Sequence, residues 1–169
     1  WSMLNDEVKA GRVRNLGISL GSNKNVYQTD KATELNASVI QVVYNRINQA
    51  PEEEVFGSCI KQDLGVLARV PLASGYLSGK YQPGARWAEG DVRHRRKAED
   101  IDEALAEVEK IKAAEVPEGV SMASWALAWC LKHPAVTCVI PGCKSVEQVR
   151  TNAAAVDLVT DPHPQDWKD

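Results

Sequence analysis

Short apolar runs alternate with amphipathic segments along this chain, and each such pair predicts a strand followed by a helix. The strongest strand signals are the runs at 38–44 (SVIQVVY), 65–70 (GVLARV) and 136–140 (VTCVI), and a further strand is expected over 12–19 (RVRNLGIS). Short runs that are apolar at nearly every position are typical of strands buried on both faces of a parallel sheet.

Helical periodicity separates these strands. It is clearest over 98–115, where Ile101, Leu105, Val108 and Ile111 recur at steps of three and four residues. The other helices are expected over 2–10, over about 24–35 after a cap at Ser22 or Asn23, from Pro51 to Gln62, from the cap Ser121 to Pro134, and from Ser145 onward.

The order of these elements is strand, helix, strand, helix, strand, loop with helices, strand, helix. Successive βα units predict an α/β fold with a parallel sheet and right-handed crossovers. Four such units are half of a (βα)8 TIM barrel, which typically needs about 250 residues. We therefore expect four parallel strands with outer helices over 1–160, and a frayed tail over 161–169.

The segment 140–152 (IPGCKSVEQVRTN) carries the clearest candidate chemistry. Ser145 and Gln148 have the spacing of a capping box, and Lys144 precedes the cap. A helix N-terminus with a neighbouring lysine favours an anion, and a phosphate on a nucleotide is the functional interpretation. The alternative is that the two polar residues only cap each other while Lys144 is an ordinary solvated lysine. Val146, Val149, Ala153 and Val156 give this helix a side to bury.

Two other stretches suggest a ligand. Gln41 interrupts a β-branched run, where a glutamine costs free energy unless it is hydrogen-bonded, either by a neighbouring backbone or by a ligand. The segment 71–81 (PLASGYLSGKY) has small residues and glycines that let a backbone approach a ligand, and an irregular basic loop follows over 82–97. All these polar stretches follow strands, at the end where a βα barrel keeps its site.

Composition narrows the function classes. The 169 residues are 44% hydrophobic and 25% charged, with a formal net charge of −3, so we expect no basic field for nucleic acid. No run approaches the ~18 unbroken apolar residues of a membrane span, and no signal-peptide pattern is visible. Four cysteines without a CxxC pair favour buried free thiols in a reducing cytoplasm, and no histidine has the setting of a metal ligand. Residue 1 is Trp rather than Met, which favours a piece of something longer.

Four blocks of the sequence resemble the aldo-keto reductases, in order and at the separations of that family. The blocks are GRVRNLGIS, VIQVVYN, GVLARVPLASGYLSGKY and IPGCKSVEQVRTNAAA. The resemblance covers nearly the whole chain and is to the carboxyl-terminal half of the family's barrel. It implies that the fold is that half-barrel and that the cofactor is NADP(H).

The resemblance also implies site residues. Ser19 and Gln41 match positions that hold the nicotinamide carboxamide, although the family usually has Asn where this chain has Leu20. Arg69 occupies a position that is often aromatic and stacks on the nicotinamide. The loop that wraps the pyrophosphate is matched by Pro71, Leu72, Ala73, Ser74, Gly75, Leu77 and Lys80, with Arg86 as a further contact. The grip on the 2′-phosphate and adenine is matched by Gly142, Lys144, Gln148 and Asn152, although the family commonly has Glu where this chain has Thr151. Lys144 favours NADP(H) over NAD(H).

The family's catalytic Asp, Tyr, Lys and His lie in the amino-terminal half, so the resemblance places no catalytic residue in this chain. It implies a parent enzyme that reduces aldehydes or ketones, with this chain inactive alone. Potassium-channel β subunits share the fold and cofactor loop, so a regulatory binding module is an alternative, as is a non-catalytic half-barrel. Because a half-barrel exposes strand edges, we expect it to pair with the missing half, with a copy of itself or with another protein.

Overall fold

The computed structural model describes residues 1–23 and 26–160, so the predicted tail at 161–169 lies outside the described residues. Within them, one sheet holds four parallel strands in the order β1-β2-β3-β4. The elements in chain order are α1 (Ser2–Lys9), β1 (Leu16–Ser19), α2 (Tyr27–Asp30), β2 (Ala37–Val43), η1 (Ala50–Glu52), α3 (Val55–Lys61), β3 (Gly65–Arg69), η2 (Ala73–Ser78), η3 (Val92–Arg95), α4 (Ala98–Glu115), α5 (Met122–Leu131), β4 (Cys138–Ile140), α6 (Val146–Ala153) and η4 (Ala154–Leu158).

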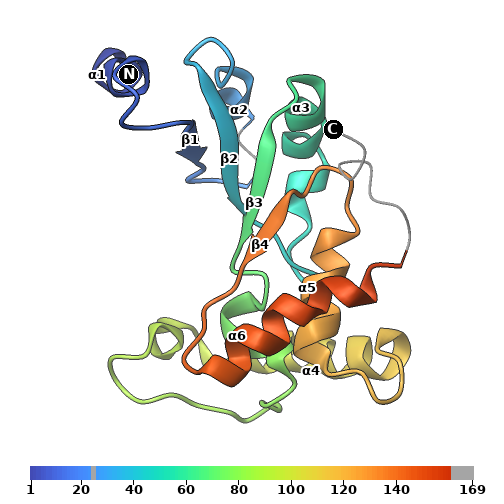
Figure 1. The fold of residues 1–169 in the computed structure, drawn as a ribbon. Helices are drawn as coiled ribbons and strands as arrows, with labels where there is room; N and C mark the ends of the chain where they lie inside the picture. The colour runs from blue at the N-terminus through green and yellow to red at the C-terminus, as the bar shows by residue number, and fades with distance from the viewer. Residues whose placement is uncertain (24–25, 161–169) are drawn as a thin grey trace.

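Helices α3 and α5 cover one face of the sheet (Figure 1). Alternate side chains of the central strands, such as Ile40, Val42 and Val66, are fully buried against Val55 and Phe56 of α3. This alternation follows from the pleat, because successive side chains of a strand point to opposite faces. The residues between them face the other side of the sheet and are half-buried or exposed.

A second hydrophobic cluster lies beyond the carboxyl ends of the strands, where η2, α4 and α5 meet. Leu105, Val108 and Ile111 on one side of α4 pack with Tyr76 and Leu77 of η2. The predicted periodicity of 98–115 is therefore confirmed, with the same bounds. This cluster holds η2 beneath the carboxyl end of β3 and therefore fixes the position of the loop 71–81 relative to the sheet.

The helix caps follow the sequence signals. The Ser121 hydroxyl accepts a hydrogen bond from the Ser124 amide at the start of α5, and the Ser145 hydroxyl accepts one from the Gln148 amide at the start of α6. Such caps satisfy amides that a first helical turn leaves without partners.

Several predicted elements are shorter than expected. The strand expected over 12–19 begins only at Leu16, and that expected over 136–140 begins at Cys138. Of the helix expected over about 24–35, one turn is helical at Tyr27–Asp30, and residues 24 and 25 lie outside the described residues. The helix expected from Pro51 is divided into η1 and α3.

The expectation that α6 buries its valine side is wrong. The side chains of Val146, Val149 and Val156 are 68%, 52% and 56% exposed, and Ala153 is exposed as well. The physical reason is position: α6 follows β4, the last strand of the sheet, so its outer side faces solvent (Figure 1).

Candidate functional site

A row of side chains crosses the uncovered face of the sheet near the carboxyl ends of the strands. Strand register aligns Ser19 with Gln41, Gln41 with Leu67, and Leu67 with Cys138. The Gln41 side-chain amide donates a hydrogen bond to the Ser19 hydroxyl at 3.0 Å. The polar residue inside the β-branched run is therefore explained locally by a partner on the next strand, and its amide oxygen lies at the uncovered face.

Arg69 ends β3 one step further along, in register with Val43 and Ile140. Its Nη2 donates to the carbonyl oxygen of Leu20 at 3.3 Å, so the guanidinium reaches across β2 toward the end of β1. Its Nε is buried and has no hydrogen-bond partner. A buried donor without an acceptor is unfavourable by about 1–3 kcal/mol, so an added acceptor at this point would be stabilised.

The backbone between β3 and α4 turns sharply at η2. Ala73, Ser74 and Gly75 have φ values of +49°, +59° and +94°, a left-handed conformation that residues with a Cβ rarely adopt. Pro71, Ala73 and Leu77 are buried, whereas Leu72, Ser74 and Gly75 are half-buried. This loop therefore offers its backbone rather than large side chains, and the exposed Lys80 follows it.

The arginines of the cationic loop after η2 have different partners. Arg86 forms two hydrogen bonds to the Asp102 carboxylate of α4, at 2.9 and 2.7 Å, which ties this part of the loop to α4. Arg93 instead approaches η2, where its Nη1 donates to the Ser74 carbonyl oxygen at 3.3 Å. The family resemblance implies Arg86 as the contact of this loop with the pyrophosphate, and that stays a prediction. The contact of Arg93 with η2 was not predicted from the sequence.

The start of α6 forms a variant of the predicted capping box. The Gln148 side-chain oxygen accepts from the backbone amide of Lys144 at 2.7 Å, one residue before the cap. The Asn152 side chain donates to the sulfur of Cys143 at 3.1 Å. Gly142 has no heavy atom within 4 Å of the position a Cβ would take, and the Lys144 side chain is exposed.

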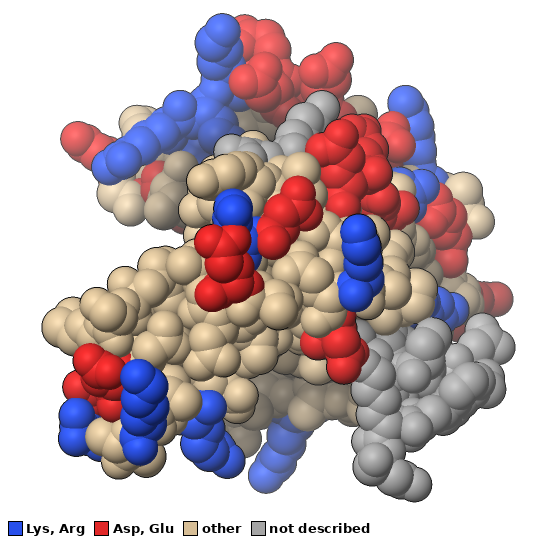
Figure 2. All heavy atoms as spheres, turned by 90° about the horizontal axis from the view of Figure 1, so that it is seen from above, with Lys and Arg blue, Asp and Glu red and all other residues tan. Residues whose placement is uncertain are grey.

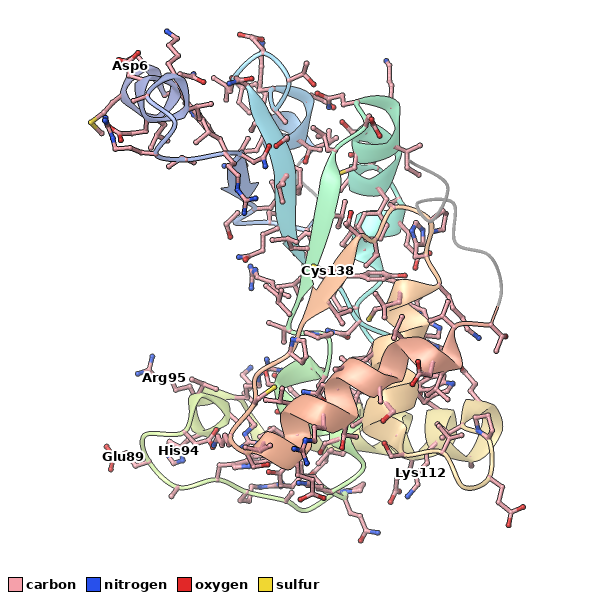
Figure 3. All side chains as sticks on the ribbon, in the orientation of Figure 1. Asp6, Glu89, His94, Arg95, Lys112 and Cys138 are labelled. Atoms are coloured by element: carbon pink, nitrogen blue, oxygen red, sulfur yellow. The ribbon has the colours of Figure 1, made fainter. Side chains whose placement is uncertain are left out.

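The two loops come together at one end of the molecule. Figure 3 places His94 and Arg95 of the 82–97 loop near the start of α6, below the carboxyl ends of the strands. The positive charge of Lys144 contributes, after the Arg93 side chain and the Arg93 amide, to the lowered pKa of Asp91. Segments around Gln41, Arg69, Ser74 and Lys144 thus share the carboxyl end of the sheet, where a parallel βα fold keeps its ligands.

The remaining candidate groups are distributed differently. Cys59 and Cys130 are buried, Cys138 is half-buried, and Cys143 is exposed, so the expectation of buried thiols holds for two of the four. All four are free thiols. Among residues 1–23 and 26–160, no cluster of histidine, cysteine and acidic residues could hold a metal ion, and no helix is long and apolar enough to cross a bilayer.

At the opposite end of the molecule, seen from above in Figure 2, acidic and basic side chains are interspersed. A cavity of about 290 Å³ lies at that end, between α1 and the beginnings of the strands, and polar side chains such as Asn15, Asn36 and Ser38 line it. It belongs to the amino end of the sheet and not to the candidate site.

Sequence comparison identifies the chain's relatives. The model of the aldo/keto reductase family matches residues 1–165. The chain belongs to this family. An uncharacterized oxidoreductase, YrpG, of Bacillus subtilis is 29% identical over 165 residues, which are 95% of this chain and 49% of that protein. The aldo-keto reductase yakc [NADP(+)] of Schizosaccharomyces pombe is 28% identical over 157 residues, 89% of this chain and 46% of that protein.

A third relative carries a different description. A probable voltage-gated potassium channel subunit beta of Arabidopsis thaliana is 35% identical over 101 residues, 57% of this chain and 31% of that protein. The matched segments therefore cover between about a third and a half of the length of these curated relatives.

Solved structures agree on the fold. An aldo-keto reductase from Bacillus halodurans, in its holo form, aligns with a TM-score of 0.68 at 23% identity, over 94% of this chain and 49% of that one. A glycerol dehydrogenase from Gluconobacter oxydans aligns with a TM-score of 0.76 at 21% identity, over 96% of this chain and 49% of that one. The predicted half of a TIM barrel, with four parallel strands, is confirmed.

Proposed function

We propose that this chain is the cofactor-binding half of an NADP(H)-dependent aldo-keto reductase, an oxidoreductase that reduces aldehydes or ketones to alcohols. The observation that carries the proposal is the Ser19–Gln41 pair on the uncovered face of the sheet. A primary amide and a hydroxyl side by side provide both donors and acceptors, which suits the carboxamide of nicotinamide.

The residues present fit such a cofactor. The buried Nε of Arg69 lacks an acceptor, and its planar guanidinium lies one register step beyond Gln41, where it can stack on a flat ring. The backbone of 71–75, with Leu77 and Lys80, would hold the pyrophosphate. Gly142, Lys144, Gln148 and Asn152 would hold the 2′-phosphate and adenine at the N-terminus of α6, where the helix dipole favours an anion.

The chemistry divides between cofactor and protein. When bound, the nicotinamide supplies the hydride. Ser19 and Gln41 would orient the carboxamide, and Arg69 would stack on the nicotinamide ring. None of these side chains is assigned to move a proton. We therefore expect the 169-residue chain alone to bind the cofactor without turnover, because the family's Asp, Tyr, Lys and His set has no assigned counterpart in it.

The experiment is a titration of the chain with NADPH and with NADH, followed by nicotinamide fluorescence. We expect NADPH to bind more tightly, and Lys144→Met to remove most of that preference because Lys144 would hold the 2′-phosphate. Lys132→Met, at an exposed lysine beyond the end of α5, is the matched control and should retain the preference. No fluorescence change with either nucleotide would contradict the proposal and favour a non-catalytic half-barrel.

A regulatory binding module is the second candidate, supported by the likeness to the probable potassium channel subunit beta. Both candidates bind the cofactor, so the titration does not separate them. Consumption of NADPH that depends on a carbonyl compound, measured with the parent protein that supplies the Asp, Tyr, Lys and His set, would favour the enzyme. Cofactor binding without such consumption would favour the module.

We further propose that the chain does not persist as a monomer. Strands β1 and β4 are the edge strands of the sheet, and the helices at the two ends of the chain expose apolar side chains, among them Met3 and Leu4 of α1 and Val146 and Val149 of α6. Unpaired strand edges and apolar surface favour association with the other half-barrel or a second copy. Light scattering should give a mass above the 18.5 kDa of one chain, and a monodisperse species of that mass would contradict the proposal.

A further inference from the structure

Arg93 is a largely covered, half-buried cation in a surface loop. Its side chain is only 14% exposed. The Nε and Nη2 groups donate to the two Asp91 oxygens at 2.8 and 2.6 Å, and the Asp91 carboxylate also accepts from the Arg93 amide at 2.9 Å. The guanidinium plane is therefore fixed by a bidentate pair, the geometry that gives arginine its directional strength.

Two aromatic rings fix the same group from the sides. The Arg93 guanidinium carbon lies 4.3 Å from the ring centre of Trp87 and 5.1 Å from that of Tyr81. These rings contact each other edge to face, with centres 5.1 Å apart. Such contacts favour a cation over each ring face. The loop 81–93 thus folds around one arginine. Two of the five guanidinium N–H groups donate to Asp91, and Nη1 provides a further donor direction.

That donor direction ends at η2. The Arg93 Nη1 donates to the Ser74 carbonyl oxygen at 3.3 Å, while the Gly75 amide donates to the Leu72 carbonyl oxygen at 2.8 Å. The Ser74 carbonyl and the Gly75 amide belong to the same peptide plane, so this plane is held at both ends. It lies in the left-handed segment, a conformation that persists only where its surroundings hold it.

Gly75 allows this approach. A Cβ built on Gly75 would lie 3.3 Å from the Arg93 Nη1, closer than an ordinary contact, and the φ of +94° disfavours any side chain there. The glycine therefore has two functions, since it permits the left-handed turn and also leaves room for the guanidinium.

We propose that Arg93, aligned by Asp91, Trp87 and Tyr81, is a positioning residue that holds the Ser74–Gly75 peptide in the conformation that receives a dinucleotide's pyrophosphate. This deepens the proposed function and rests on it for the identity of the ligand. The hold itself exists without ligand, so it can be measured independently.

The first measurement is amide hydrogen exchange of the ligand-free chain, read on peptides that cover 72–78. Arg93→Met should raise exchange at the Gly75 amide by at least about tenfold, because an unpinned peptide plane opens more often. Arg93→Lys should not restore protection, because a lysine lacks the planar fork that binds Asp91 and Ser74 together. Peptides within α4 serve as the internal reference for folding and should exchange as in the wild type.

Arg95→Met is the matched control. Arg95 is exposed and belongs to the same loop, and its side chain extends away from the ribbon in Figure 3. It should leave exchange at 72–78 unchanged. Unchanged exchange in Arg93→Met, or full protection in Arg93→Lys, would overturn the proposal. Asp91→Asn, which keeps Arg93 but weakens its alignment, should show an intermediate rise.

The second measurement is the dissociation rate of NADPH in stopped flow. Arg93→Met and Arg93→Lys should release NADPH at least about tenfold faster than the wild type and Arg95→Met, a difference that corresponds to about 1.4 kcal/mol. Equal rates in all four proteins would overturn the positioning role. If the wild type binds no NADPH, the proposed function fails, and the exchange measurement still decides whether Arg93 holds the loop.

Discussion

Replacement of Gln41 by leucine separates the stability of the sheet from its binding function. The substitution removes one hydrogen bond, from the Gln41 amide to the Ser19 hydroxyl at 3.0 Å. A bond between neutral groups contributes a net of about 0.5–1.5 kcal/mol, and less where water can replace it, as on this uncovered face. Leucine at a half-buried position offsets part of the loss by burying apolar surface. We therefore expect the free energy of unfolding to change by no more than about 1 kcal/mol, or roughly 2–4 °C in Tm.

The effect of Gln41→Leu on NADPH binding should be larger. If the amide makes two hydrogen bonds to the carboxamide, their loss together weakens binding by about 2 kcal/mol, which is roughly 30-fold in Kd. The assay is the fluorescence titration with NADPH, run beside thermal unfolding of the same preparations. Gln49→Leu is the control, because the Gln49 amide donates to the Arg46 carbonyl at 2.9 Å away from the site. It should bind NADPH as the wild type does.

Two results would contradict this role of Gln41. Wild-type affinity in Gln41→Leu would mean that the glutamine does not contact the ligand, and its polarity would then be explained by Ser19 alone. A stability loss above about 3 kcal/mol would mean that the Ser19–Gln41 bond is buried and structural, contrary to its exposure in the sheet.

Three further predictions concern stability and reactivity. The Arg86 side chain, together with the Gly84 amide, lowers the pKa of Asp102 from 3.8 to about 2. Because the pKa is depressed in the folded state, the resulting stabilisation is present above about pH 4 and is lost as the pH falls toward 2. The difference in urea midpoint between wild type and Asp102→Asn should therefore shrink over that range, and a constant difference would contradict the assignment. Burial raises the pKa of the Cys59 and Cys130 thiols to about 12. Alkylation at pH 8, followed by mass spectrometry, should therefore show modification of the exposed Cys143 first and of these two thiols only upon unfolding. Early modification of Cys59 or Cys130 would contradict the packing. Leu105→Ala, at a fully buried position of α4, should reduce the free energy of unfolding by about 2–5 kcal/mol in chemical denaturation, whereas Val149→Ala on exposed α6 should change it by less than about 0.5 kcal/mol.

The parts of the fold that depend on local signals were predictable from sequence. The bounds of α4 follow from its apolar period, and the starts of α5 and α6 follow from Ser121 and Ser145, whose hydroxyls satisfy the first-turn amides. The parallel order of the strands follows from the βα repeat. In each case the deciding interactions lie within a few residues of one another or repeat along one element.

The parts that depend on distant partners were not predictable in the same way. The period of Val146, Val149 and Val156 places them on one side of the helix expected from Ser145, but it cannot show whether another element covers that side. The basic loop has no helical or strand periodicity either, so the sequence could not show whether Arg86 or Arg93 contacts η2. The Asp91-x-Arg93 spacing was the available signal, because a carboxylate two residues away can align a guanidinium from within the same turn.

We propose that the carboxyl ends of these strands together form one continuous cradle for a dinucleotide. Hydrogen exchange with and without saturating NADPH tests it most directly, because three separate stretches of the chain are read in a single experiment. We expect simultaneous protection of peptides that cover 39–44, 69–78 and 142–152, with α3 unchanged. Protection confined to one of the three stretches, or none at all, would contradict it.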